Sequence, residues 1–168
     1  MIKKQTLKTK KYNRLAYDAQ SNFITDGNFA INTDYLNFDN DLITHKVIKK
    51  QSFMKNSDGI NDTDHAPKIN AIIDHDTIQK SYIAINTALM QPYFEGSKKQ
   101  VKQYFELNNG TYSTIDIRLL DLLPDDIDLH IYAKNNLSAH YFVTNNNKIV
   151  ALLMPLRFDG NSYLKDVV

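Results

Sequence analysis

The sequence predicts an α+β fold that is mostly antiparallel sheet, with two helices packed on one face. Glu is scarce, at 2 residues against 17 Asp, so long solvent-facing helices are not expected. The 17 Ile and the 18 Tyr and Phe suit strands. Asp and the 18 Asn favour turns and caps, because their short side chains bond to nearby backbone. We therefore expect short strands joined by polar turns.

The length and composition fit one domain over residues 1–168. Apolar residues make up 42% of the 168, enough for a packed core. No apolar run reaches the roughly 18 residues of a membrane span, and no secretory signal follows the first lysines, so we expect a cytoplasmic protein without membrane contact. Without cysteine there is no disulfide or thiolate zinc site. The net charge of +1 does not support DNA contact, although six cations lie in the first fourteen residues.

Short strands and a hairpin are expected in the N-terminal half. Residues 15–17 and 23–24 read as strands, and Phe29 and Ile31 follow after Asp26-Gly27. Asp-Gly is a strong hairpin signal, because Gly accepts a positive φ freely. Residues 42–48 predict a further strand, and the polar stretch 54–68 predicts a long loop.

Two helices and four strands are expected in the C-terminal half. An apolar stripe predicts a helix over 77–90, ended by Pro92. A second helix is predicted over 113–123, with Ser113 or Thr114 as its cap. The strands are expected at four segments: 101–107, 127–131, 139–143 and 149–154.

Two short segments carry a family resemblance. Met154-Pro155-Leu156-Arg157, after Ala151-Leu152-Leu153, resembles the Met-Pro-Met-Arg type signature that closes the chain of bacterial sliding clamps, the rings that tether a polymerase to DNA. Together with the helix and strands expected before it, this similarity covers residues 101–158. Thr25-Asp26-Gly27-Asn28 resembles the Thr-Asp-Gly-His signature of the same family, with Asn28 in place of the His.

The resemblance implies a DNA-clamp-like fold and a peptide pocket. In the family both signatures line one pocket, which captures short linear peptides of replication proteins. A soft Met beside a proline would form a rigid apolar wall, and Arg157 would hold a polar or acidic atom at the rim. The expected binding residues are Thr25, Gly27, Asn28, Met154, Pro155, Leu156 and Arg157.

The first interpretation is thus a non-enzymatic, sliding-clamp-like protein of a phage or mobile element. It would dock a replication-protein peptide or a second copy of itself, with no catalytic residue, cofactor or metal. This fits the bias toward Asn, Lys and Ile, which is typical of AT-rich coding sequences.

Two alternatives stay open. The clusters Asp62-Thr63-Asp64-His65 and Asp74-His75-Asp76 combine carboxylates with imidazole, the groups that hold divalent metals, so a small metal-dependent nuclease or hydrolase is one alternative. Asp74 or Asp76 as a helix cap is the structural interpretation of the second cluster. The other alternative is a host-takeover or regulatory binding protein.

Overall fold

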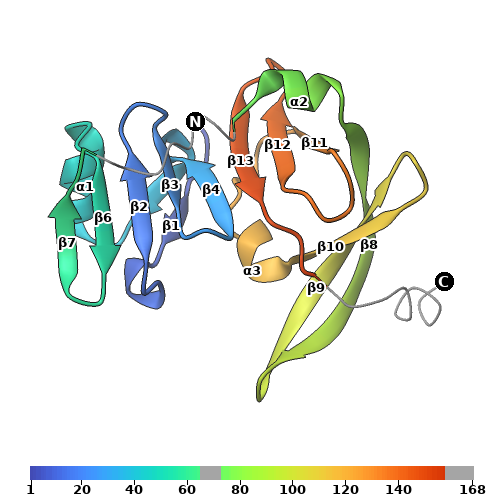
Figure 1. Ribbon diagram of the computed structural model, residues 1–168, viewed down its shortest axis with the longest axis horizontal. Coiled ribbons are helices and arrows are strands. Elements are labelled where there is room, and N and C mark those ends of the chain that lie inside the picture. Colours follow the sequence, from blue (N-terminus) through green and yellow to red (C-terminus); the bar gives the residue numbers. More distant parts are fainter. Residues whose placement is uncertain (65–72, 158–168) are drawn as a thin grey trace.

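The computed structural model describes residues 1–64 and 73–157 (Figure 1). Within these residues, eleven strands form one antiparallel sheet in the order β10-β9-β8-β11-β12-β13-β4-β3-β2-β6-β7. A separate parallel pair joins β1 (Gln5–Leu7) to β5 (Leu36–Phe38). The predicted α+β class with a mostly antiparallel sheet is confirmed. In the described part of the chain, no helix is long and apolar enough to cross a membrane.

The N-terminal half supplies one side of the sheet. Its strands are β2 (Leu15–Asp18), β3 (Phe23–Thr25), β4 (Phe29–Asn32), β6 (Phe53–Asn56) and β7 (Gly59–Asp62). Two single 3-10 turns, at Thr9–Lys11 and Thr33–Tyr35, lie between them. The strands expected at 15–17 and 23–24 and the Asp26-Gly27 hairpin are confirmed.

Two expectations for this half are wrong. Residues 42–48 belong to helix α1 (Asp41–Ile48), because the Asn40 side chain accepts the Ile43 amide and so caps a first turn. The expected loop over 54–68 contains the β6–β7 hairpin, whose turn uses Gly59 at a φ of 136°. The last part of that loop lies outside the described residues.

The C-terminal half supplies the other strands. They are β8 (Tyr82–Glu95), β9 (Lys98–Leu107), β10 (Tyr112–Asp116), β11 (Leu129–Ala133), β12 (His140–Thr144) and β13 (Ile149–Leu153). The short helices are α2 (His75–Gln79) and α3 (Ile117–Leu120). The four strands expected near 101–107, 127–131, 139–143 and 149–154 are confirmed.

Both predicted helices have the wrong extent. The expected helix at 77–90 ends after α2, and Tyr82–Glu95 is strand β8, paired along its length with β9. The apolar side chains spaced at helical intervals are largely exposed on that strand, so they are not a buried helical stripe. The expected helix at 113–123 begins only at Ile117, because Asp116, rather than Ser113 or Thr114, caps it by accepting the Arg118 amide at 2.8 Å.

The sheet curls on itself in the C-terminal half. β10 and β12 have three strands between them, and neighbouring strands lie about 4.8 Å apart, so a flat sheet would separate them by about 19 Å. Instead, Ser113 Oγ lies 2.6 Å from His140 Nε2. After β13, the Leu156 amide donates to the Thr114 carbonyl at 2.7 Å, so the chain returns to β10. Phe105, Leu107 and Ile115 are buried in the core of this curl.

Candidate functional site

The turn between β3 and β4 is held by its own side chains. The Gly27 amide donates to Thr25 Oγ1 at 3.0 Å, and the amides of Asn28 and Phe29 donate to Asp26 Oδ1 at 2.8 and 3.1 Å. Gly27 has a φ of 98°, which only Gly adopts without strain, and open space surrounds the position where a Cβ would stand. Thr25 and Asp26 therefore fix the turn, and Gly27 and Asn28 lie exposed on it.

The structure brings the two expected signatures together. β13 pairs with β4, with Leu153 opposite Phe29, and the Met154 amide then donates to the Asn28 carbonyl at 2.9 Å. The next residues leave β4 and run to β10. Pro155 is buried, Met154 and Leu156 are half-buried, and Arg157 is exposed. Residues 154–157 thus bridge the β3–β4 turn and strand β10.

An aromatic residue that the sequence did not indicate packs against Phe29, which follows the β3–β4 turn. The Tyr12 ring meets the Phe29 ring edge-on, with centroids 5.5 Å apart. Burial and the Asp26 carboxylate raise the pKa of the Tyr12 phenol, and the positive charge of Arg118 opposes them. The Tyr12 phenol therefore lies within electrostatic range of both Asp26 of the turn and Arg118 of α3. We call the surface formed by Tyr12, residues 25–28 and residues 154–157 the turn surface.

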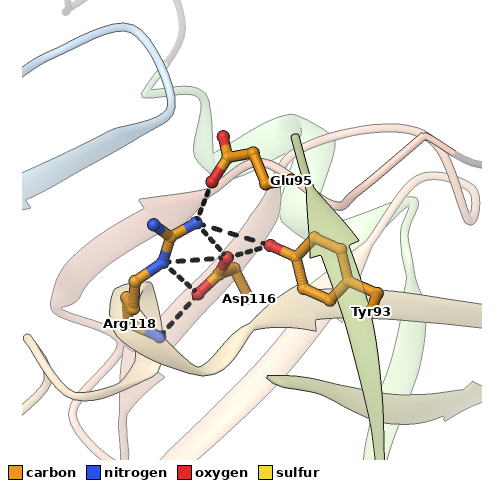
Figure 2. Close-up of polar contacts among 4 residues, drawn as sticks. All are labelled: Tyr93, Glu95, Asp116 and Arg118. Carbon is orange, nitrogen blue, oxygen red and sulfur yellow. Dashed lines mark hydrogen bonds and ion pairs between the residues drawn. The ribbon is translucent and has the colours of Figure 1, made fainter. Parts of the chain in front are cut away.

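Figure 2 shows a polar cluster formed by side chains from three elements. Tyr93 and Glu95 come from β8, Asp116 from the end of β10, and Arg118 from α3. Arg118 Nη2 lies 2.9 Å from Glu95 Oε2 and 2.6 Å from Asp116 Oδ2. The Tyr93 hydroxyl donates to Asp116 Oδ2. The cluster fixes the end of β8 against α3.

The charges within the cluster are stabilised. Burial alone would raise the pKa of Asp116, but hydrogen bonds from Arg118 and Tyr93 outweigh it and hold that pKa below its usual value. The Asp116 hydrogen bond raises the pKa of Arg118. Burial and the Asp116 carboxylate raise the pKa of Tyr93 to about 12. At neutral pH the cluster therefore holds a carboxylate, a guanidinium and a neutral phenol, which suits a structural tie better than proton transfer.

Of the first Asp/His cluster, the structure describes Asp62, Thr63 and Asp64. Asp62 pairs with Lys46 of α1, whose side chain is 11% exposed. In the described ranges, no three acidic or histidine side chains lie close enough to hold an ion, and His65 lies outside those ranges. The Asp62–Lys46 pair therefore joins α1 to β7.

In the second cluster, Asp74 accepts the Asp76 amide at 2.9 Å and caps α2. The structural interpretation of that cluster is correct.

A buried hydrogen bond between Ser113 and His140 is the second feature that the sequence did not indicate. His140 is fully buried, and its Nδ1 lies 3.0 Å from the Ser138 carbonyl oxygen. A carbonyl only accepts, so Nδ1 carries the proton and Nε2 accepts from the Ser113 hydroxyl. Ser113 is 4% exposed, so a substrate cannot reach this pair. Ser113 and His140 therefore stabilise the curl of the sheet.

The comparisons with known proteins add no relative. No protein-family model matches the chain, and neither the curated proteins nor the solved structures contain a match.

Proposed function

We propose that this chain is a non-enzymatic, sliding-clamp-like protein that binds a short peptide of a replication protein at the turn surface. The hydrogen bond between the Met154 amide and the Asn28 carbonyl carries the proposal. It joins the two segments that resemble clamp signatures, although they are far apart in the sequence. An arrangement with these segments at opposite ends of the sheet would have removed the basis for a shared pocket.

The chemistry of the turn surface supports a peptide ligand. Met154, Leu156 and Tyr12 are half-buried, so each keeps part of an apolar side chain at the surface. Arg157 is exposed beside them and suits a carboxylate or a backbone carbonyl of the ligand. The backbone amides of the β3–β4 turn are already bonded to Thr25 and Asp26, so recognition depends on side chains rather than on these amides.

The test is a titration of a fluorescent clamp-binding peptide of a bacterial replicative polymerase, followed by anisotropy. Met154→Ala combined with Arg157→Ala removes an apolar and a charged contact. Because loss of an anchor costs about 1–4 kcal/mol, binding should weaken by one to a few powers of ten. The matched control is Met54→Ala with Lys134→Ala, on β6 and after β11, which should leave binding unchanged. No binding of the unaltered protein at millimolar peptide would refute the proposal.

A further inference from the structure

Five cations gather at the end of the sheet that carries the turn surface. Ala16 of β2 pairs with Thr25 of β3, so β2 begins where β3 ends, beside the β3–β4 turn. Leu15 pairs with Lys55, so β6 ends there as well. The segment that leads into β2 therefore lies at this end, and residues 8–14 contain no acidic side chain. The five cations are Lys8, Lys10, Lys11, Arg14 and Lys55.

The 3-10 turn Thr9–Lys11 holds its lysines on an ordered backbone. The Thr9 amide and hydroxyl both donate to Asp39 Oδ1 at 2.8 Å, and Thr9 is buried. The Lys11 amide donates to the Lys8 carbonyl at 3.0 Å, which joins these two residues across the turn. Their side chains are exposed. A ligand would therefore meet cations whose backbone is already in place.

Tyr12 connects these cations to the turn surface. Lys11 precedes Tyr12, whose amide donates to the Thr9 carbonyl at 3.3 Å. The Lys55 ammonium donates to the Tyr12 carbonyl. An ammonium group has three donors, so Lys55 keeps donors for a further acceptor. A ligand that contacts Tyr12 therefore comes within reach of Lys11 and Lys55.

The positive charge at this end of the sheet is not neutralised by the protein itself. In residues 1–64 and 73–157, none of the five cations forms an ion pair. Two carboxylates at this end are already engaged, because Asp26 accepts amides of its own turn and Asp39 accepts from Thr9. A third, Asp58 of the β6–β7 turn, is exposed. The surface beside Tyr12 thus keeps an excess of positive charge.

This charge selects the sequence around the apolar anchor of the ligand. We infer that the peptide bound at the turn surface carries a run of acidic residues on one flank of its anchor, and that their carboxylates meet Lys11 and Lys55. Lys8 and Arg14 add to the attraction. The inference rests on the proposed function, because it names the class of peptide that the turn surface takes. One flank is specified because the cations lie on the Tyr12 side of that surface.

A nucleic acid is also an anion, but it fits this surface less well. The exposed parts of Met154 and Leu156 suit apolar side chains of a peptide and offer nothing to phosphates. A base could stack on an aromatic ring, but the Tyr12 ring is half-buried and meets the Phe29 ring edge-on at 5.5 Å. The net charge of +1 also gives little general attraction for a phosphate backbone.

The test uses three fluorescent peptides that share the clamp-binding core of a bacterial replicative polymerase. One has Ser on both flanks, and the other two replace the Ser of either the amino-terminal or the carboxy-terminal flank by a run of Asp. At low salt, one of the Asp peptides should bind about tenfold more tightly than the Ser peptide, because several exposed ion pairs of modest strength add up. This gain should shrink at high salt, since screening weakens exposed pairs.

The variant Lys8→Gln with Lys11→Gln locates the acidic flank. It should reduce the gain of the Asp peptide over the Ser peptide from about tenfold to about threefold, because two of the cations are lost. The matched control is Lys49→Gln with Lys50→Gln. It removes the same charge near the β2–β3 turn at the opposite end of the sheet, where Lys50 Nζ donates to Asn22 Oδ1 at 2.7 Å. The control should keep the full gain.

Failure of the inference can be told apart from failure of the proposed function. If the Ser peptide binds and the Asp peptides bind no more tightly, or both gain equally, the inference is overturned and the proposed function stands. If no peptide binds at millimolar concentration, both are overturned. A gain that Lys8→Gln with Lys11→Gln leaves intact would overturn the inference. Tight binding of a single-stranded oligonucleotide that this variant abolishes would assign the cations to nucleic acid and overturn it too.

Discussion

Ser113 of β10 and His140 of β12 form a buried hydrogen bond of 2.6 Å across the interior of the curled sheet. The His140 ring also meets the Phe105 ring edge-on, at 6.2 Å between centroids. A neutral imidazole fits this place, because its one proton goes to the Ser138 carbonyl and its other nitrogen accepts from Ser113. Protonation would put a charge and a second donor into the core.

Stability should therefore fall in mild acid. Burial lowers the pKa of His140 to about 4, whereas an unfolded chain has a His pKa of about 6.5. Between these values the unfolded state binds more protons, so the free energy of unfolding decreases as the pH falls, by about 3 kcal/mol in total. Urea unfolding from pH 7.5 to 4.5 measures this slope.

The control for the acid effect is the double variant Ser113→Ala with His140→Leu. It removes the titrating group together with its partner and should be less stable at pH 7.5 but less sensitive to acid. An equally steep loss of stability in this variant would assign the effect to other groups.

Much of the fold was predictable because turns and short strands carry local signals. The Asp26-Gly27 hairpin and the apolar segment at 149–153 needed no knowledge of distant residues. Helix α1 was missed because the Asn40 side chain accepts the Ile43 amide and caps the first turn. This cap outweighs the strand preference of Ile43 and Val47. Strand β8 was missed because its apolar spacing also fits a helix, and its pairing with β9 decides between them.

The candidate sites were predictable only in part. The turn surface was expected from two short signatures, and the structure shows that they meet. Tyr12 was not expected there, because its contact with Phe29 depends on tertiary packing. Tyr93 and Glu95 reach Arg118 only because β8 is a long strand. The sequence predicted a helix over 77–90 instead, and that prediction gave no indication of the polar cluster.

Asp62 should contribute to stability and not to metal binding. Asp62→Asn removes the ion pair with Lys46, whose side chain is largely buried. Because the Asp62 side chain is 68% exposed, the loss should be only about 1 kcal/mol of unfolding free energy. Asp64→Asn, an exposed residue nearby, is the control and should change little. Thermal melts with and without Mg²⁺, Mn²⁺ or Zn²⁺ should coincide for all three proteins. A metal-dependent rise in Tm that Asp62→Asn removes would favour the hydrolase alternative.

Arg118 should hold the β8–β9 hairpin in place. Arg118→Ala leaves Asp116, whose side chain is 5% exposed, without its cation, and the unfolding free energy should fall by about 2–3 kcal/mol. Tyr93→Phe removes one hydrogen bond and should cost about 1 kcal/mol. Amide hydrogen exchange should show faster exchange in β8 and β9 for both variants, with the β2–β3 strands unchanged. Arg14→Ala, which alters an exposed arginine, is the control. If β8 and β9 exchanged as slowly in Arg118→Ala as in the unaltered protein, the role of the cluster would be contradicted.

The β3–β4 turn should require glycine for its backbone and not for space. Gly27 has a φ of 98°, outside the left-handed helical region, and no atom lies within 4 Å of a built Cβ. Gly27→Asn should therefore cost about 1–2 kcal/mol of unfolding free energy through backbone strain alone. Gly96 has a φ of 61°, which Asn tolerates, so Gly96→Asn should be nearly neutral.

If the turn surface binds the replication peptide, Gly27→Asn should also weaken that binding, because the Asn28 carbonyl that positions Met154 follows the strained residue directly. Equal stability of the two variants would contradict the strain argument. Unchanged peptide affinity in a destabilised Gly27→Asn protein would place the peptide elsewhere on the sheet.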